Sequence, residues 1–184
     1  EVQPMVDSLN GLLARLGART VVAATVRAIQ LLGRQFVLGR HMSEAMREAD
    51  DQRRTNRGLR FSYDMLGEGA RTERDAARHL LAYQRAIEDV GAGLRGEGPE
   101  ARATAGRGPE VAAATNRGPE AADGISVKLS ALFSRYEEAQ RARVFAELVP
   151  RVWLLIDAAA RADINLTIDA EECDRLELSL DLFE

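Results

Sequence analysis

Three short segments of the sequence alternate between apolar and polar residues. They are Arg60–Met65, Gly124–Ser130 and Ile164–Asp169. Such alternation predicts a β-strand with one apolar face and one polar face. For the middle segment, two interpretations stay open. It is either an edge strand with one solvated face or a strand whose polar face lines a ligand cavity.

Each polar face carries a charged side chain near the end of its strand, namely Asp64, Lys128 or Asp169. Burying an unpaired charge costs on the order of several kcal/mol. The three charges are therefore expected to pair with one another, with further barrel residues or with a polar ligand. We hypothesise that Lys128 and Asp169 face one cavity. The alternative is a mutual Lys–Asp ion pair without a catalytic part.

Apolar residues recur at helical spacing after each of these strands. The first helix follows a capping box that begins at Thr72, and it is predicted to end at Gly91 and Gly93. The second covers about Glu137–Ala160, and Pro150 is expected to kink it or split it. The third begins near Glu171. Its predicted apolar side consists of Cys173, Leu176, Leu180 and Phe183.

The order of elements, helices followed by β-α-β-α-β-α, implies parallel strands joined by helical crossovers. The strands of a doubly wound sheet are apolar on both faces, whereas these are apolar on one face only. A sheet curled into a barrel explains this, with helices outside and a polar mouth at the C-terminal ends of the strands. We therefore predict an α/β fold. It is a partial (β/α)8 TIM-type barrel with the first three βα units, preceded by a helical segment.

The chain is predicted to contain two parts. Residues 1–56 form a helical N-terminal segment in which we find no candidate chemistry, and residues 57–184 form the three βα units. Within the second part, residues 91–123 carry Gly-Pro-Glu at ten-residue intervals among Ala, Arg and Thr. This composition is typical of a flexible surface insertion. The arginine-rich run at 50–60 is interpreted as a solvated helix end.

Composition and charge exclude several classes of function. The chain has 25 Lys and Arg against 29 Asp and Glu, a formal net charge of −4, so no nucleic-acid partner is expected through this segment. The single cysteine, Cys173, permits no internal disulfide, and neither histidine is spaced as a metal ligand. Charged and polar residues interrupt the most apolar run, Val21–Leu38, and no signal peptide is visible. We expect a cytoplasmic protein without a metal site.

Four motifs follow one another along the chain: Phe36–Gly39, Arg60–Glu68, Gly124–Leu132 and Ile168–Glu177. Together they resemble the flavin-dependent proline dehydrogenases, most closely the proline dehydrogenase domain of bacterial bifunctional proline utilisation proteins. The resemblance implies a distorted (β/α)8 barrel with noncovalently bound FAD. It also implies oxidation of L-proline to Δ1-pyrroline-5-carboxylate, with electrons passed to quinone and peripheral association with the inner face of the membrane.

The resemblance also implies roles for individual residues. Lys128 matches the strand lysine beside the flavin and the substrate carboxylate, and Asp169 matches an aspartate of the active site. Both are therefore candidate catalytic and cofactor-binding residues, and Lys128 is also a candidate substrate-binding residue. Ala170 matches a residue that contacts FAD. Glu68 matches a loop glutamate that pairs with a substrate-binding arginine and acts as a gate.

The sequence departs from a complete family member in its extent. A full barrel takes roughly 250 residues, whereas this chain of 184 residues starts at Glu1 and stops inside a predicted helix. The resemblance places the paired substrate arginines and most FAD contacts in later strands and the last helix. We therefore expect an excerpt of a proline dehydrogenase that is inactive by itself. The alternative is a non-catalytic truncated barrel or scaffold with no activity of its own.

Overall fold

The computed structural model describes residues 17–33, 37–67, 69–95 and 119–184. The chain divides into two compact units, Glu1–Glu48 and Ala49–Glu184. Several predictions concern positions outside the described residues. They are the first 16 residues of the predicted helical segment, the first residue of the motif at Phe36, the gate residue Glu68 and most of the Gly-Pro-Glu repeats.

The first unit contains α2 (Ala18–Gly33) and the beginning of α3 (Met42–Thr55). Both lie within the segment that was predicted to be helical. Ala45 of α3 is buried, whereas the apolar stripe of α2 is exposed at Val22, Val26 and Ile29. Among the described residues, neither α2 nor any other helix has the length and apolar character needed to cross a membrane.

The second unit is built on a three-stranded parallel sheet in the order β1-β2-β3. The strands are β1 (Ser62–Asp64), β2 (Gly124–Val127) and β3 (Asn165–Ile168). The predicted parallel pairing is confirmed. All four residues of the central strand β2 are buried, so its interpretation as an edge strand with one solvated face is wrong.

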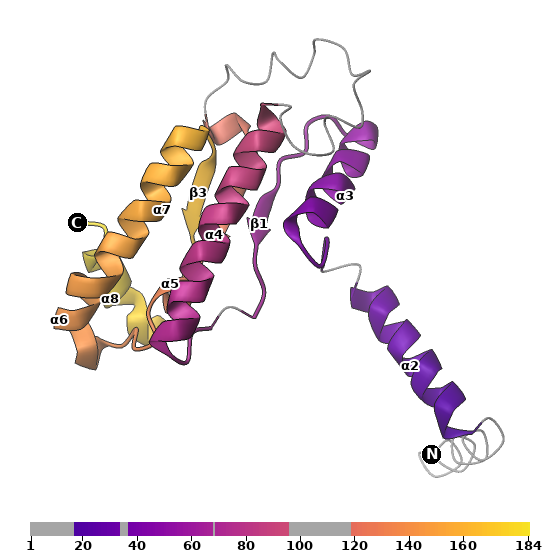
Figure 1. The fold of residues 1–184 in the computed structure, drawn as a ribbon, viewed down its shortest axis with the longest axis horizontal. Helices are drawn as coiled ribbons and strands as arrows, with labels where there is room; N and C mark the ends of the chain where they lie inside the picture. The colour runs from indigo at the N-terminus through magenta and orange to yellow at the C-terminus, as the bar shows by residue number, and fades with distance from the viewer. Residues whose placement is uncertain (1–16, 34–36, 68, 96–118) are drawn as a thin grey trace. The chain divides into compact units, whose positions relative to one another are not determined.

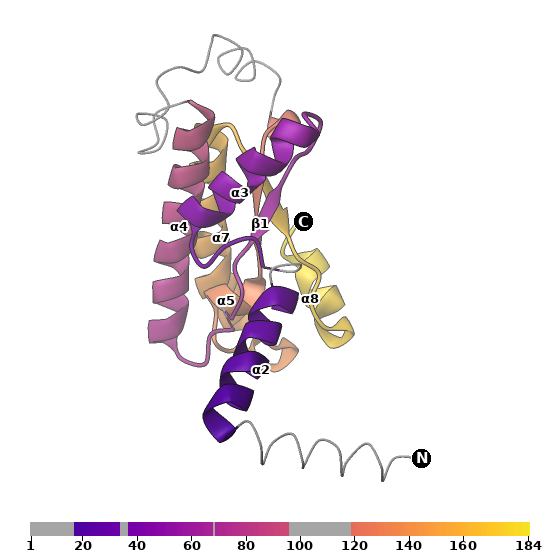
Figure 2. The ribbon, with the colours of Figure 1, turned by 90° about the vertical axis from the view of Figure 1, so that its right-hand side faces the viewer.

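Helices α4 (Glu73–Leu94) and α7 (Val149–Ala162) cover the same face of this sheet (Figure 1, Figure 2). Crossovers between parallel strands share one hand, so two successive crossovers in the order β1-β2-β3 put both helices on one side. The predicted capping box begins α4. The Thr72 hydroxyl accepts the Asp75 N–H at 3.1 Å, and the Asp75 carboxylate accepts the Thr72 N–H at 3.0 Å.

The sequence predicted that α4 ends at Gly91 and Gly93, and this prediction is wrong. The helix continues through Gly91 and Gly93 to Leu94. Gly91 is buried, and a Cβ added there would lie 2.8 Å from the Cβ of Ala162 on α7. The glycine is therefore needed for the close approach of two helices rather than for helix termination.

Pro150 divides the predicted helix at 137–160 as expected. A 3-10 turn (Glu138–Gln140) and α6 (Arg141–Arg143) lead into a π-helical stretch (Val144–Leu148), and α7 follows directly. Proline has no N–H to donate to the preceding turn. The π-helical stretch lies where the regular hydrogen-bond pattern is interrupted.

The chain after β3 forms a 3-10 turn (Cys173–Arg175) and then α8 (Leu176–Asp181). Leu178 is buried, whereas Cys173, Leu176, Leu180 and Phe183 are exposed. Of the four residues predicted for one apolar side, Leu176 and Leu180 lie in α8, whereas Cys173 and Phe183 lie outside it. The helix begins later than the predicted start near Glu171, after the 3-10 turn.

A charged cluster closes the N-terminal ends of β1 and β2. The Asp123 carboxylate accepts the backbone N–H of Phe61 at 3.0 Å and the hydroxyl of Tyr63 at 3.2 Å, and it pairs with Arg53. The guanidinium of Arg53 lies 5.0 Å from the centre of the Phe61 ring. The arginine-rich run is thus not wholly a solvated helix end. Asp123, predicted within the flexible insertion, is a buried residue of this unit.

Candidate functional site

Three charged side chains meet at the C-terminal ends of the strands. The Nζ atom of Lys128 lies 2.6 Å from Oδ1 of Asp64 and 3.0 Å from Oδ2 of Asp169. The side chains of Lys128, Asp64 and Asp169 remain 30%, 37% and 27% exposed. The prediction that the three charges lie on one polar side of the sheet is confirmed.

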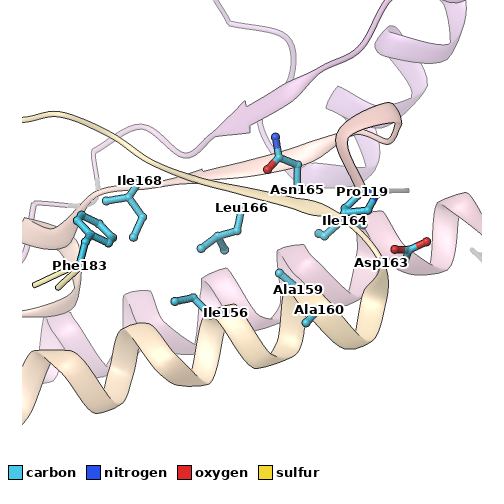
Figure 3. Close-up of a pocket in the computed structure, with 10 residues that line it drawn as sticks. All are labelled: Pro119, Ile156, Ala159, Ala160, Asp163, Ile164, Asn165, Leu166, Ile168 and Phe183. Carbon is cyan, nitrogen blue, oxygen red and sulfur yellow. The ribbon is translucent and has the colours of Figure 1, made fainter. Parts of the chain in front are cut away.

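The register of the sheet brings these residues together. Asp64 lies beside Ser126, and Ser126 lies beside Thr167, on the face opposite the helices. Figure 3 shows Leu166 directed toward α7 and Asn165 directed away from it. The alternation read from the sequence therefore sorts the strand residues correctly. Their apolar side chains point to the helices, and their polar side chains point to the open face.

A hydrogen bond fixes the Asp169 carboxylate in this cluster. The Ser126 hydroxyl donates to Oδ1 of Asp169, while Lys128 lies against Oδ2. Partial burial of Asp169 opposes its ionisation, but the hydrogen bond from Ser126 and the charge of Lys128 outweigh burial and lower its pKa. Asp169 therefore stays ionised at neutral pH and holds the ammonium in place.

The chain turns sharply directly after β2. The predicted strand reached Ser130, but β2 ends at Val127 and a single helical turn, α5 (Leu129–Leu132), follows. Lys128 is the N-cap residue of that turn, with extended backbone angles of φ −98° and ψ 131°. Its backbone N–H donates to the hydroxyl of Tyr83, a buried residue of α4, at 3.3 Å. Ser130 therefore does not belong to the polar face of the strand.

Other residues near the cluster are placed as follows. Ala170 is exposed and directly follows Asp169. Glu171, predicted only as a helix start, has a side chain that is 9% exposed and reaches the turn after Lys128. Sequence reasoning missed this contact. The available signal was the position of this glutamate, two residues after Asp169 and before the first helical turn begins.

Two hollows in the described part of the structure are lined by residues other than Asp64, Lys128 and Asp169. One of about 650 Å³ lies between α7 and β3 and is lined mainly by apolar side chains, including Ile156, Leu166 and Ile168 (Figure 3). Another of about 610 Å³ is lined by residues such as Ser130, Tyr136 and Arg175. The predicted cavity shared by Lys128 and Asp169 stays a prediction.

Comparison with known proteins gives the family. The sequence matches the family model for proline dehydrogenase over residues 45–184. The bifunctional protein PutA of Klebsiella aerogenes and that of Escherichia coli are each 42% identical over 177 residues, which is 96% of this chain. A crystal structure of a Bradyrhizobium japonicum proline utilization A mutant is 44% identical with a TM-score of 0.61, covering 93% of this chain and 15% of that one.

The match covers nearly all of this chain but only a small part of each relative. The chain spans 12% of the length of the two curated relatives. The family model nevertheless covers most of the present sequence, including all three strands and the Lys128 cluster. The chain belongs to the proline dehydrogenase family.

Proposed function

We propose that this chain is part of an FAD-dependent proline dehydrogenase that oxidises L-proline to Δ1-pyrroline-5-carboxylate. The observation that carries the proposal is the Lys128 ammonium, held between Asp64 and Asp169 and still 30% exposed. An ammonium that remains reachable from solvent can contact an anionic ligand, and the two carboxylates fix its position. Family membership supplies the identity of that ligand.

The fold proposal is the N-terminal part of a (β/α)8 barrel. Three parallel strands in sequential order, with both crossover helices on one face, support it. The apolar hollow beside β3 supports it as well, because a further helix of a barrel would cover this position. In this proposal residues 1–56 precede the barrel and residues 57–184 supply its first three βα units, with 91–123 as an insertion.

Each residue of the cluster has a proposed task. Lys128 binds the substrate carboxylate and stabilises negative charge that develops nearby during the reaction. Asp169, itself fixed by Ser126, orients the ammonium and provides an acceptor for further cationic side chains. The two tasks require Asp169 to be ionised, and its lowered pKa supports this.

The chemistry of the residues fits a flavin. A lysine ammonium is a suitable neighbour for a ring that becomes negatively charged, and the small side chain of Ala170 permits close approach. We propose that Lys128, Asp169 and Ala170 contact FAD. When bound, the flavin supplies an acceptor for the hydride that leaves the proline carbon next to nitrogen.

Further parts of the proposal rest on family membership alone. Glu68 acts as a gate that excludes water from the site. Electrons pass from the enzyme to quinone, and the protein is cytoplasmic with peripheral association at the inner face of the membrane. Electron transfer to quinone is tested with membrane vesicles whose quinone has been extracted and then restored.

The activity is tested on the full-length gene product. The purified protein is expected to be yellow, and anaerobic addition of L-proline should bleach its flavin absorbance and reduce an artificial electron-accepting dye. D-proline serves as a control for the fit of the site to substrate. A colourless protein that neither binds flavin nor reduces the dye would reject the proposal and favour the alternative of a non-catalytic scaffold.

A further inference from the structure

Glu171 connects the end of β3 to the turn that follows Lys128. Its Oε1 atom accepts the backbone N–H of Ser130 at 2.8 Å, and its Oε2 atom accepts a hydrogen bond from Arg175 at 3.0 Å. The side chain is only 9% exposed. Hydrogen bonds to a charged acceptor that is largely removed from water are among the stronger ones in proteins.

The turn that Glu171 contacts has no cap of its own. Ser130 is the second residue of α5, and the N-cap residue Lys128 makes no side-chain capping bond. First-turn N–H groups have no partner within a helix and need an external acceptor. Glu171 supplies that acceptor from the segment after β3, so it performs the task that a serine or aspartate at the N-cap position usually performs.

Ser130 is held from two sides. Its N–H donates to Glu171, which follows β3, and its carbonyl oxygen accepts the N–H of Ala70 at 3.2 Å, which follows β1. One residue therefore joins the segments after all three strands. These are the segments that carry or adjoin Asp64, Lys128 and Asp169.

The backbone of Lys128 is thereby fixed at both ends. The Asp169 N–H donates to the carbonyl oxygen of Val127 at 3.0 Å on one side, and the Glu171–Ser130 bond fixes the turn on the other. Loss of the second bond would free the turn while leaving strand pairing intact. The direction in which the lysine side chain leaves the sheet would then vary.

We propose that Glu171 is a positioning residue for Lys128, which caps the α5 turn so that the ammonium points at the ligand carboxylate. This inference rests on the proposed function, because it takes Lys128 as the residue that binds that carboxylate. Glu171 itself does not touch substrate in this proposal. It acts through the backbone of Ser130.

Arg175 does not need Glu171 to neutralise its charge. Arg175 also pairs with Glu172 at 3.1 Å, and its guanidinium lies 5.6 Å from the centre of the Tyr136 ring. A variant that removes the Glu171 carboxylate therefore leaves the guanidinium with a carboxylate partner. This makes Glu171 testable without stranding a partly buried charge.

The test uses a matched set of variants of the full-length protein. Glu171→Met keeps the side-chain length but removes the acceptor, whereas Glu171→Gln retains an amide oxygen for the Ser130 N–H. Glu172→Gln is the control, because Glu172 pairs with the same arginine but its side chain is 66% exposed. The probe is pyrrole-2-carboxylate, which has a five-membered nitrogen ring and a carboxylate as proline does, but is aromatic and therefore has no hydride to give.

Calorimetric titration should give a dissociation constant about tenfold higher for Glu171→Met, close to wild type for Glu172→Gln and intermediate for Glu171→Gln. The KM for L-proline should rise most for Glu171→Met, less for Glu171→Gln and least for Glu172→Gln. The change in kcat should be smaller than the change in KM. Wild-type affinity in a folded Glu171→Met variant would overturn the inference. So would fast hydrogen exchange at the Ser130 amide of the wild-type protein, a measurement that needs no variant.

Lys128→Ala separates this inference from the proposed function. If Lys128→Ala binds the probe as tightly as wild type, the proposed carboxylate site is wrong and the positioning role is rejected with it. If Lys128→Ala weakens binding and Glu171→Met does not, the proposed function stands and the positioning role alone fails.

Discussion

The sheet carries a charged cluster at each end, and the two clusters differ in how far they are closed. At the N-terminal ends of the strands, Asp123 is bound by Arg53, a backbone N–H and Tyr63. Its side chain is 9% exposed. At the C-terminal ends, Lys128 lies between two carboxylates, and all three side chains are about a third exposed.

The difference separates a network that is closed to solvent from a cluster that solvent reaches. Partial burial disfavours the charged form of Arg53, but Asp123 outweighs this and raises the pKa of Arg53. Burial and the Asp123 charge raise the pKa of Tyr63, so its hydroxyl keeps the proton that it donates. The Asp123 cluster is thus satisfied within the protein. The Lys128 cluster is paired but remains partly exposed.

The largest expected effect is on catalysis, from Lys128→Ala in the full-length protein. In the proposed function, loss of the ammonium removes the group that binds the substrate carboxylate and a charge that stabilises the transition state, so flavin reduction by L-proline should slow by about 100- to 1,000-fold. The free energy of unfolding should change by less than about 1 kcal/mol, because the pair is partly exposed. Stopped-flow absorbance and urea denaturation measure the two quantities.

Lys128→Ala can also break the comparison. If flavin reduction proceeds at the wild-type rate while the melting temperature falls, the Lys128 cluster has a structural role only, as the Asp123 cluster does. Lys128→Arg is a useful companion, because it keeps the charge and alters its geometry.

Asp123→Ala should have the opposite signature. It leaves a partly buried guanidinium, a hydroxyl and a backbone N–H without their shared acceptor. The free energy of unfolding should fall by about 3 kcal/mol. In the fraction that remains folded, L-proline should still reduce the flavin at nearly the wild-type rate, because Lys128 lies at the other end of the strands. A large loss of rate in folded Asp123→Ala protein would show that the two ends are coupled.

Tyr63→Phe sharpens the same point with a smaller change. It removes one hydrogen bond to the Asp123 carboxylate, 3.2 Å long, and leaves the ring in place. We expect a loss of about 1.5 kcal/mol in the free energy of unfolding, measured by urea denaturation. A loss equal to that of Asp123→Ala would mean that the tyrosine hydroxyl, rather than the carboxylate with Arg53, holds this cluster together.

The Lys128 cluster could be predicted from the sequence, and the Asp123 cluster could not. Period-two alternation fixes which side of a strand a residue takes, so Asp64, Lys128 and Asp169 were assigned to one face without knowledge of the fold. The pairing of Arg53 with Asp123 joins residues far apart in sequence. Both lay in stretches whose composition, rich in arginine or in glycine and alanine, favoured solvent exposure.

Glycine and glutamate were misread for a related reason. Gly91 has the sequence signature of a helix end, but its role depends on Ala162 of another helix. Glu171 has the signature of a first-turn carboxylate, but it caps a turn on the neighbouring strand. Local propensity describes what a residue can do within its own segment. Which tertiary partner it meets is decided by packing, and a single sequence does not contain that information in readable form.

Ser126→Ala gives the smallest expected effect. The pH dependence of its free energy of unfolding tests whether the Lys128 cluster is open to solvent. The pKa of Asp169 is lowered from its ordinary 3.8, so the ionised form favours folding above that pH, and this contribution is lost as pH falls through the folded pKa. Removing the Ser126 hydroxyl should cost about 0.5 kcal/mol at pH 7, a value reduced by solvent screening. The difference from wild type should shrink below pH 3.8, where Asp169 begins to be protonated. Ser62→Ala, the same change at an exposed position on the polar face of β1, should show no such pH dependence. If the cost of Ser126→Ala is instead several kcal/mol and independent of pH, then Asp169 is as closed as Asp123, and the contrast between the two ends of the sheet fails.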